Sequence, residues 1–129
     1  MPNAQIEIRR RYTPGQEEGI IHAVHSAMVE GLKIPERDKT VRLVVHEPHR
    51  FPAPLGKNDR YTLINIDLFS GRSLAAKRPL YRAIVRNLEP FGIPSDHVKV
   101  LLRESPSENW GIRGGVPASE VDLGYDVNV

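Results

Sequence analysis

Apolar and polar residues alternate over residues 4–10, which is the two-residue period of a strand with one buried face. The period then changes, because Thr13 is a suitable helix N-cap and Pro14 suits a first helical turn. Gly31 and Pro35 end this predicted helix. Its apolar residues recur at helical spacing: Ile20, Ile21, Val24, Ala27, Met28 and Leu32.

The second half of the chain repeats this order of elements. After a strand predicted over residues 41–45, another is predicted over residues 61–69. Ser73 then caps a helix that ends at Gly92, and residues 98–102 give the last long strand.

The two halves also correspond in register, at offsets of 57 to 59 residues. The matching stretches are Ile6 and Ile8 with Ile64 and Ile66, Ile34-Pro35 with Ile93-Pro94, and residues 41–47 with 98–104. Two tandem β-α-β units, about 1–58 and 59–129, explain this most economically. We therefore expect one α+β domain over residues 1–129, with a four-stranded mixed sheet and both helices on one face.

The sheet face away from the helices is expected to be apolar as well, because Leu63, Ile64 and Leu68 are taken to lie on both sides of one strand. Such a face needs a cover, which self-association would supply. The proline-rich residues 48–59 are expected to form a surface loop.

Composition points to a cytoplasmic globular protein, with 40% hydrophobic residues, 26% charged residues and no cysteine. No apolar run approaches the roughly 20 residues that span a bilayer, and no signal-peptide pattern opens the chain. A net charge of +2, without interleaved aromatic and basic residues, argues against nucleic-acid binding. The histidine pairs lack a third ligand nearby, so we expect no metal site.

Pro2 is the first residue that suggests chemistry. Removal of Met1 would leave a secondary amine at the start of a strand. Such an amine serves as a base, an acid or an imine-forming nucleophile where burial or neighbouring cations disfavour its charged form.

The residues around Pro2 resemble the small subunit of 4-oxalocrotonate tautomerase. The resemblance rests on Pro2-x-Ala4-Gln5-Ile6-x-Ile8, Gln16, Val41-Arg42, Glu47, Ser70-Gly71-Arg72-Ser73 and Trp110-Gly111-Ile112-Arg113-Gly114-Gly115. It implies two such subunits fused in one chain, of which only the first keeps a proline.

Further similarity is to the malonate semialdehyde decarboxylase branch of the tautomerase superfamily. It rests on residues 25–29, Ile34-Pro35, Asp38-Lys39, His46, Pro48, Gly92-Ile93 and Asn109-Trp110. Two positions depart from that branch, since Ser70 replaces one arginine of its Arg-Pro-Arg turn and Ile112 replaces an aromatic residue.

The resemblance implies a site without a cofactor. Pro2 would be the acid or base, Asp38 would tune its amine, and Arg72 would hold a substrate carboxylate. The substrate-binding residues would be Arg42, Trp110, Ser70 and Ile112, with Trp110 as an apolar wall. The assembly implied is a homotrimer, and one of the arginines at residues 9–11 could also reach the site.

The leading hypothesis is a keto-enol tautomerase of small 2-keto or enol carboxylates. The first alternative is a decarboxylase or hydratase of 3-oxo or acetylenic acids that uses the same residues. The second is a non-catalytic trimeric binding protein, which retention of Met1 would favour because an acylated Pro2 nitrogen accepts no proton.

Overall fold

The computed structural model describes residues 1–128, which form a four-stranded sheet with two long helices. The strands are β1 (Asn3–Ile8), β2 (Val41–Val45), β3 (Thr62–Phe69) and β4 (Val98–Ser105), in the spatial order β2-β1-β3-β4. β1 pairs with β2 in parallel and β3 with β4 in parallel, whereas β1 and β3 run antiparallel. The sheet is therefore mixed and contains two β-α-β units, as expected.

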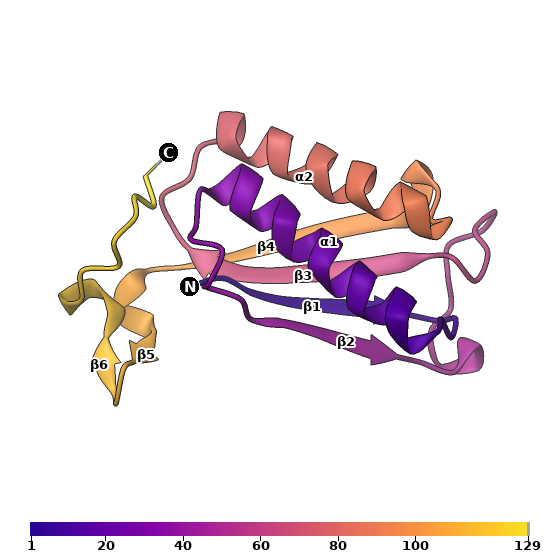
Figure 1. The fold of residues 1–129 in the computed structure, drawn as a ribbon, viewed down its shortest axis with the longest axis horizontal. Coiled ribbons are helices and arrows are strands. Elements are labelled where there is room, and N and C mark those ends of the chain that lie inside the picture. The colour runs from indigo at the N-terminus through magenta and orange to yellow at the C-terminus, as the bar shows by residue number, and fades with distance from the viewer. Residues whose placement is uncertain (129) are drawn as a thin grey trace.

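The helices are α1 (Pro14–Leu32) and α2 (Leu74–Leu88), and both cover the same face of the sheet (Figure 1). The remaining elements are short: η1 (Pro48–Arg50), η2 (Glu89–Phe91), η3 (Ser95–His97), η4 (Ser107–Asn109), η5 (Ala118–Glu120) and a hairpin of β5 (Gly111–Ile112) and β6 (Val116–Pro117). In the described residues no helix is long and apolar enough to cross a membrane.

The start of α1 is set by local chemistry. Thr13 Oγ1 accepts from the backbone N–H of Gln16 at 3.2 Å, and the Gln16 side chain accepts from the N–H of Thr13 at 3.0 Å. This reciprocal cap stabilises a helix by about 1 kcal/mol. The helix ends where Lys33 adopts a left-handed conformation, with φ 59°.

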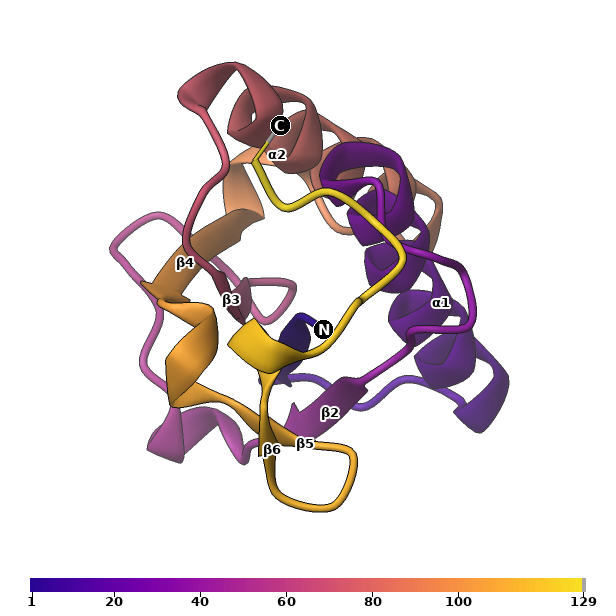
Figure 2. The same cartoon turned by 90° about the vertical axis from the view of Figure 1, so that its left-hand side faces the viewer.

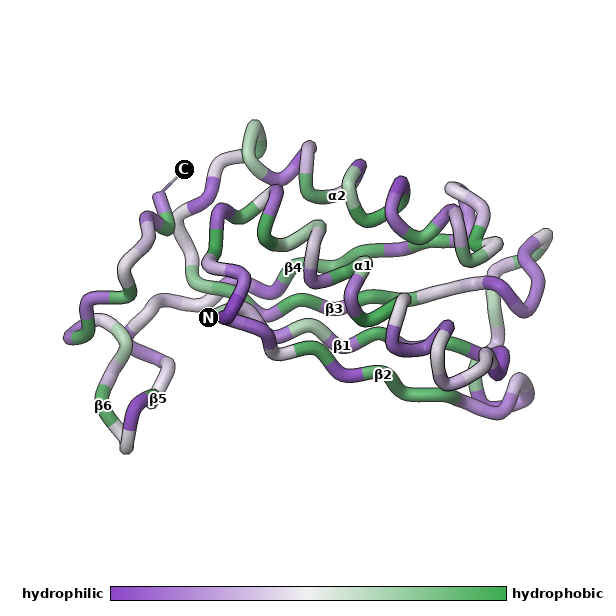
Figure 3. Tube along the Cα trace, viewed as in Figure 1, coloured by the Kyte–Doolittle hydropathy of each residue, from purple (hydrophilic) through white to green (hydrophobic). Residues whose placement is uncertain are grey.

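The core lies between the helices and the sheet. Figure 3 shows hydrophobic positions recurring along the strands and along both helices. Every second residue of β1 is fully buried, and Ile64, Ile66 and Leu68 of β3 point the same way. The helices approach each other closely at Gly31, where a Cβ atom would lie 2.8 Å from Leu80 Cα.

The opposite face of the sheet is mostly polar, so the expectation of a second apolar face was wrong. Ile64 and Leu68 share one parity along β3 and both face the helices, which leaves only Leu63 on the open side. Polar pairs occupy that side: Arg42 with Gln5, His46 and Asn65 with Glu7, and Arg103 with Asp67.

The C-terminal segment lies close to the N-terminus, where Tyr125 contacts Met1. Figure 2 shows the segment after η5 passing in front of the N-terminus and continuing toward the helices. The N-terminus and the C-terminal segment are therefore neighbours.

Candidate active site

The sheet register brings Asp38 to the start of β1. Ala4 is paired with Val41 across the parallel strands, and the Ala4 N–H donates to Thr40 O at 3.0 Å. The turn that precedes β2 consequently lies beside Met1 and Pro2. Pro2 itself is buried.

The terminal amine makes two polar contacts. The Met1 ammonium lies 3.1 Å from Asp38 Oδ2, and the Asp38 side chain is only 16% exposed. The ammonium also donates to Tyr125 Oη. Asp38 and Tyr125 therefore hold the terminal nitrogen from two different loops.

Arg72 lies close behind these groups, buried at the turn from β3 to α2. One guanidinium nitrogen donates to Leu32 O at 3.4 Å, and the side chain also forms a hydrogen bond with Tyr125. Its Nε has no acceptor within the described residues. Burial lowers the pKa of Arg72, and the nearby Tyr125 and Glu104 oppose that change.

The environment disfavours the charged form of the terminal amine. Burial lowers the pKa of the Met1 ammonium most strongly, Asp38 opposes this, and the positive charge of Arg72 lowers the pKa further. Burial also raises the pKa of Tyr125, and the negative charge of Asp38 adds to that effect. The phenol therefore stays neutral near pH 7 and can donate a hydrogen bond.

A pocket of about 230 Å³ opens onto the Met1 amine, Asp38 and Tyr125, whereas Pro2 and Arg72 are not part of its lining. It is lined by Met1, Pro35, Arg37, Asp38, Arg113, Leu123 and Tyr125. Two arginines and a partly apolar wall suit a small molecule that carries a carboxylate.

Three predicted site residues therefore meet at one end of the sheet: Pro2, Asp38 and Arg72. Arg42 is exposed on β2 and donates to Gln5 Oε1 at 3.2 Å on the open face. The arginines of residues 9–11 follow the far end of β1.

Asp38 is the one predicted site residue that lines the pocket, and Trp110, Ser70 and Ile112 lie away from it. Trp110 packs edge-on against Phe69, with ring centroids 4.7 Å apart, and its Nε1 donates to Ser105 Oγ at 2.8 Å. Ser70 is exposed in the turn after β3, and Ile112 is half-buried in the β5–β6 hairpin.

Sequence reasoning missed Tyr125, Arg113 and Arg37 as site residues. Tyr125 is 124 positions from the amine that it contacts, so no local pattern could link the two. The signal available was a single aromatic residue in an end segment where Val121, Leu123, Tyr125 and Val127 alternate with polar residues and glycine.

Among residues 1–128 no three His, Cys, Asp or Glu side chains are grouped closely enough to hold a metal ion. His25 is buried, with Nε2 2.7 Å from Glu36 O, and His46 Nε2 lies 2.9 Å from Glu7 Oε1. These histidines have structural partners.

Comparison with known proteins identifies relatives over most of the chain. Residues 38–113 match the family described as tautomerase enzymes. The probable tautomerase YusQ of Bacillus subtilis is 23% identical over 121 residues, which span 89% of this chain and 95% of that protein. The 2-hydroxymuconate tautomerase of Comamonas testosteroni is 40% identical over 57 residues, which span 43% of this chain and 89% of that protein.

Solved structures share the fold. A malonate semialdehyde decarboxylase is 25% identical, with a TM-score of 0.78 and coverage of 87% of this chain and 92% of that chain. A fused 4-OT solved as a symmetric trimer is 24% identical, with a TM-score of 0.75 and coverage of 90% and 95%.

Proposed function

The chain belongs to the tautomerase family, and on that premise we propose that it is a cofactor-independent keto-enol tautomerase of small 2-keto or enol carboxylates. Pro2, freed by removal of Met1, is the acid or base. The observation that carries this proposal is the half-buried Met1 amine beside Asp38, Tyr125 and Arg72, whose environment lowers its pKa.

The same environment acts on Pro2 once Met1 is removed. Pro2 is buried, and its amine would lie at the start of β1, close to Asp38 and Arg72. Burial and a nearby guanidinium both favour a neutral amine, which is the form that accepts a proton.

The reaction needs one proton to move between two atoms of the substrate. The neutral Pro2 nitrogen takes the hydroxyl proton of the enol, and the resulting ammonium returns a proton to the adjacent carbon to give the ketone. Asp38 stabilises the ammonium between these two steps through a charge-assisted contact.

Arginine side chains bind the substrate carboxylate in this proposal. Arg37 and Arg113 line the pocket, and Arg72 has an Nε donor that no described residue uses. Arg42, Ser70, Trp110 and Ile112 complete the proposed substrate contacts when subunits associate. We propose a trimer of these double-length subunits, in keeping with the fused 4-OT trimer.

One observation favours a second activity. The ion pair between the terminal ammonium and Asp38 at 3.1 Å opposes the loss of the amine's proton. A protonated Pro2 beside a carboxylate suits a decarboxylase or hydratase of 3-oxo acids, in which the ammonium polarises the substrate and Asp38 activates water.

The test is the ketonisation rate of phenylenolpyruvate by the processed protein, measured beside Pro2→Ala. We expect a rate well above the buffer reaction that falls by about 10²-fold or more in the variant, which is the typical contribution of a positioned acid-base group. An N-terminal mass for both proteins shows that Met1 is absent.

A rate no greater than that of buffer would overturn the tautomerase proposal. Turnover of 3-oxo acids by the same sample would then identify the second activity. Turnover of neither substrate class would leave the non-catalytic binding protein as the explanation.

A further inference from the structure

The far end of the sheet carries a structural counterpart of the Pro2 site. β1 and β3 pair antiparallel, with Ile6 opposite Ile64, so the end of β1 lies beside the start of β3. Treating the two β-α-β units as repeats, the offset that relates Ile6 to Ile64 places Arg60 where the first unit has Pro2.

One contact of the first site has a similar contact there, although the two arginines are not at corresponding positions of the repeat. Arg72 donates to Leu32 O at 3.4 Å, and Arg60 donates to Phe91 O at 2.8 Å. Leu32 is the last residue of α1 and Phe91 the last residue of η2, and the offset that relates Ile34 to Ile93 also relates Leu32 to Phe91.

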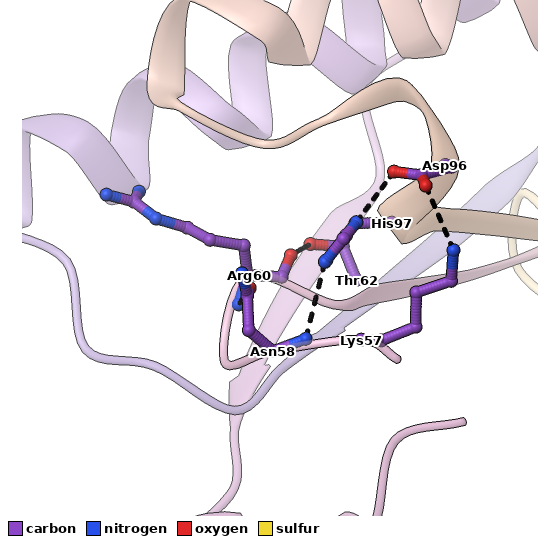
Figure 4. Close-up of polar contacts among 6 residues, drawn as sticks. All are labelled: Lys57, Asn58, Arg60, Thr62, Asp96 and His97. Atoms are coloured by element: carbon purple, nitrogen blue, oxygen red, sulfur yellow. Dashed lines mark hydrogen bonds and ion pairs between the residues drawn. The ribbon is translucent and has the colours of Figure 1, made fainter. Parts of the chain in front are cut away.

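The counterpart of Asp38 at this offset is His97. The backbone N–H of Asn58, one residue before the counterpart of Met1, donates to His97 Nε2 at 3.3 Å. Figure 4 shows this contact together with Asp96, whose two oxygens reach His97 Nδ1 and Lys57 Nζ. His97 and Lys57 lower the pKa of the Asp96 carboxyl, so it stays ionised.

This second place cannot perform the chemistry of Pro2. The chain is continuous through Arg60, so its nitrogen is an amide that accepts no proton. The side chains at this end of the sheet are mainly cationic, and such a group suits the binding of an anion more than the transfer of a proton.

Two adjoining pockets, of about 360 and 430 Å³, share Arg9, Arg10 and Asp59 in their linings. Together they present five cationic side chains, of which Arg9, Arg11 and Lys57 pair with Asp59, Glu47 and Asp96. Arg10 and Arg60 therefore carry the excess positive charge. The whole chain has a net charge of only +2, so positive charge is concentrated at this end. A concave surface of one sign attracts ions of the other.

Several donors at this end remain unused. Arg10 is exposed and makes no hydrogen bond or ion pair within residues 1–128, and Arg9 Nε is buried without an acceptor. Arg10 and Arg60 lie 5.6 and 5.5 Å from the ring centroid of Tyr12, so two like charges share one aromatic ring. A bound anion would offset their repulsion.

The pocket of about 430 Å³, lined by Arg9, Arg10, Lys57 and Arg60, is called the second pocket below. We propose that it is a non-catalytic binding site for a small dianion that carries carboxylate or phosphate groups. Arg9 and Arg60 are held by backbone carbonyls and form its fixed wall. Arg10 supplies the free guanidinium, and Lys57, which pairs with Asp96 at 3.1 Å, supplies a second charge. The proposal does not depend on catalysis at Pro2.

The experiment is an NMR titration of the 15N-labelled protein with inorganic phosphate and, separately, with malonate, at an ionic strength held constant with sodium chloride. The backbone amides of Asn58, Asp59 and Arg60 report on the second pocket, and those of Asp38 and Tyr125 report on the first. We expect the chemical shifts of Asn58, Asp59 and Arg60 to change with at least one anion and to reach saturation.

The variants are Arg10→Gln and Lys57→Gln, with Arg78→Gln on α2 as the matched control. Loss of one charged hydrogen-bond donor should weaken binding at the second pocket about tenfold. The control should bind as the unmodified protein does. Saturation by phosphate alone, by malonate alone or by both supports the site and identifies the group that it takes.

The proposal would be overturned if the chemical-shift changes rose linearly with anion concentration, or if sodium chloride alone caused the same changes. Equal affinity in all three variants would overturn it too. Because the reporting amides differ, failure here is distinguishable from failure of the Pro2 site.

Discussion

At the scale of single residues, neighbouring groups change the pKa of the terminal Met1 amine in opposite directions. Burial and the Arg72 charge lower the pKa of the amine, and Asp38 raises it through its charge and its hydrogen bond. A tautomerase needs the neutral amine as its base, whereas the decarboxylase alternative needs the ammonium. The pH dependence of the rate therefore distinguishes the two.

Replacement of Asp38 by Asn should move the acid limb of the tautomerase profile to lower pH. Asp38 raises the pKa of the amine, so its loss lowers that pKa, and the neutral base persists to lower pH. The measurement is kcat/KM for phenylenolpyruvate from pH 5 to 9 in both proteins, which reports the ionisations of the free enzyme. An unmoved limb, or a move to higher pH, would contradict the assigned role of Asp38.

The sequence predicted part of this site and missed part of it. Pro2, Asp38 and Arg72 were identified because each stands in a motif that resembles a known family. Tyr125 and Arg113 were missed because their positions depend on how the last segment crosses the N-terminus, which no periodicity encodes. Trp110 was expected at the pocket, yet within one chain it packs on Phe69.

At the scale of elements, the periodicity and caps predicted all four long strands and both helices. The caps explain the accuracy at the helix starts, since Thr13 and Ser73 both accept the expected backbone N–H groups. The error concerned the faces of β3, because Leu63 was grouped with Ile64 and Leu68 although alternate residues point to opposite sides.

The crossing of α1 and α2 depends on Gly31. A Cβ there would lie 2.8 Å from the Cα and Cβ of Leu80, and backbone cannot move aside as a flexible side chain can. Gly31→Ala should therefore lower the free energy of unfolding by about 1–2 kcal/mol, the cost of overpacking less the gain in helix propensity. Urea denaturation measures this change.

Gly15→Ala is the matched control, because a Cβ at Gly15 in the same helix meets nothing within 4 Å. It should leave stability unchanged or raise it by up to about 1 kcal/mol. If the two variants were equally stable, close approach at Gly31 would not govern the helix crossing.

At the scale of the whole molecule, both edges of the sheet are open to other subunits. β2 and β4 each pair on one side only within the described residues, and unpaired strand edges favour association. Leu101 of β4 is 52% exposed, which adds an apolar contact at one edge. The polar open face is compatible with a wet interface between subunits.

The proposed assembly is tested by native mass spectrometry. We expect a complex of three 14.5 kDa chains, as in the fused 4-OT that was solved as a symmetric trimer. A monomer at micromolar concentration would contradict the assembly and would also remove the subunit contacts proposed for Arg42 and Trp110.

The central claim is that Pro2 carries a free amine whose surroundings favour its neutral form. The most direct measurement is an NMR pH titration of the processed protein labelled with 15N-proline, compared with an unfolded peptide of the same N-terminal sequence. The account predicts a pKa for the Pro2 amine below that of the peptide, because in the folded protein burial and Arg72 together outweigh Asp38, as they do at the Met1 amine. A pKa equal to or above that of the peptide would contradict it.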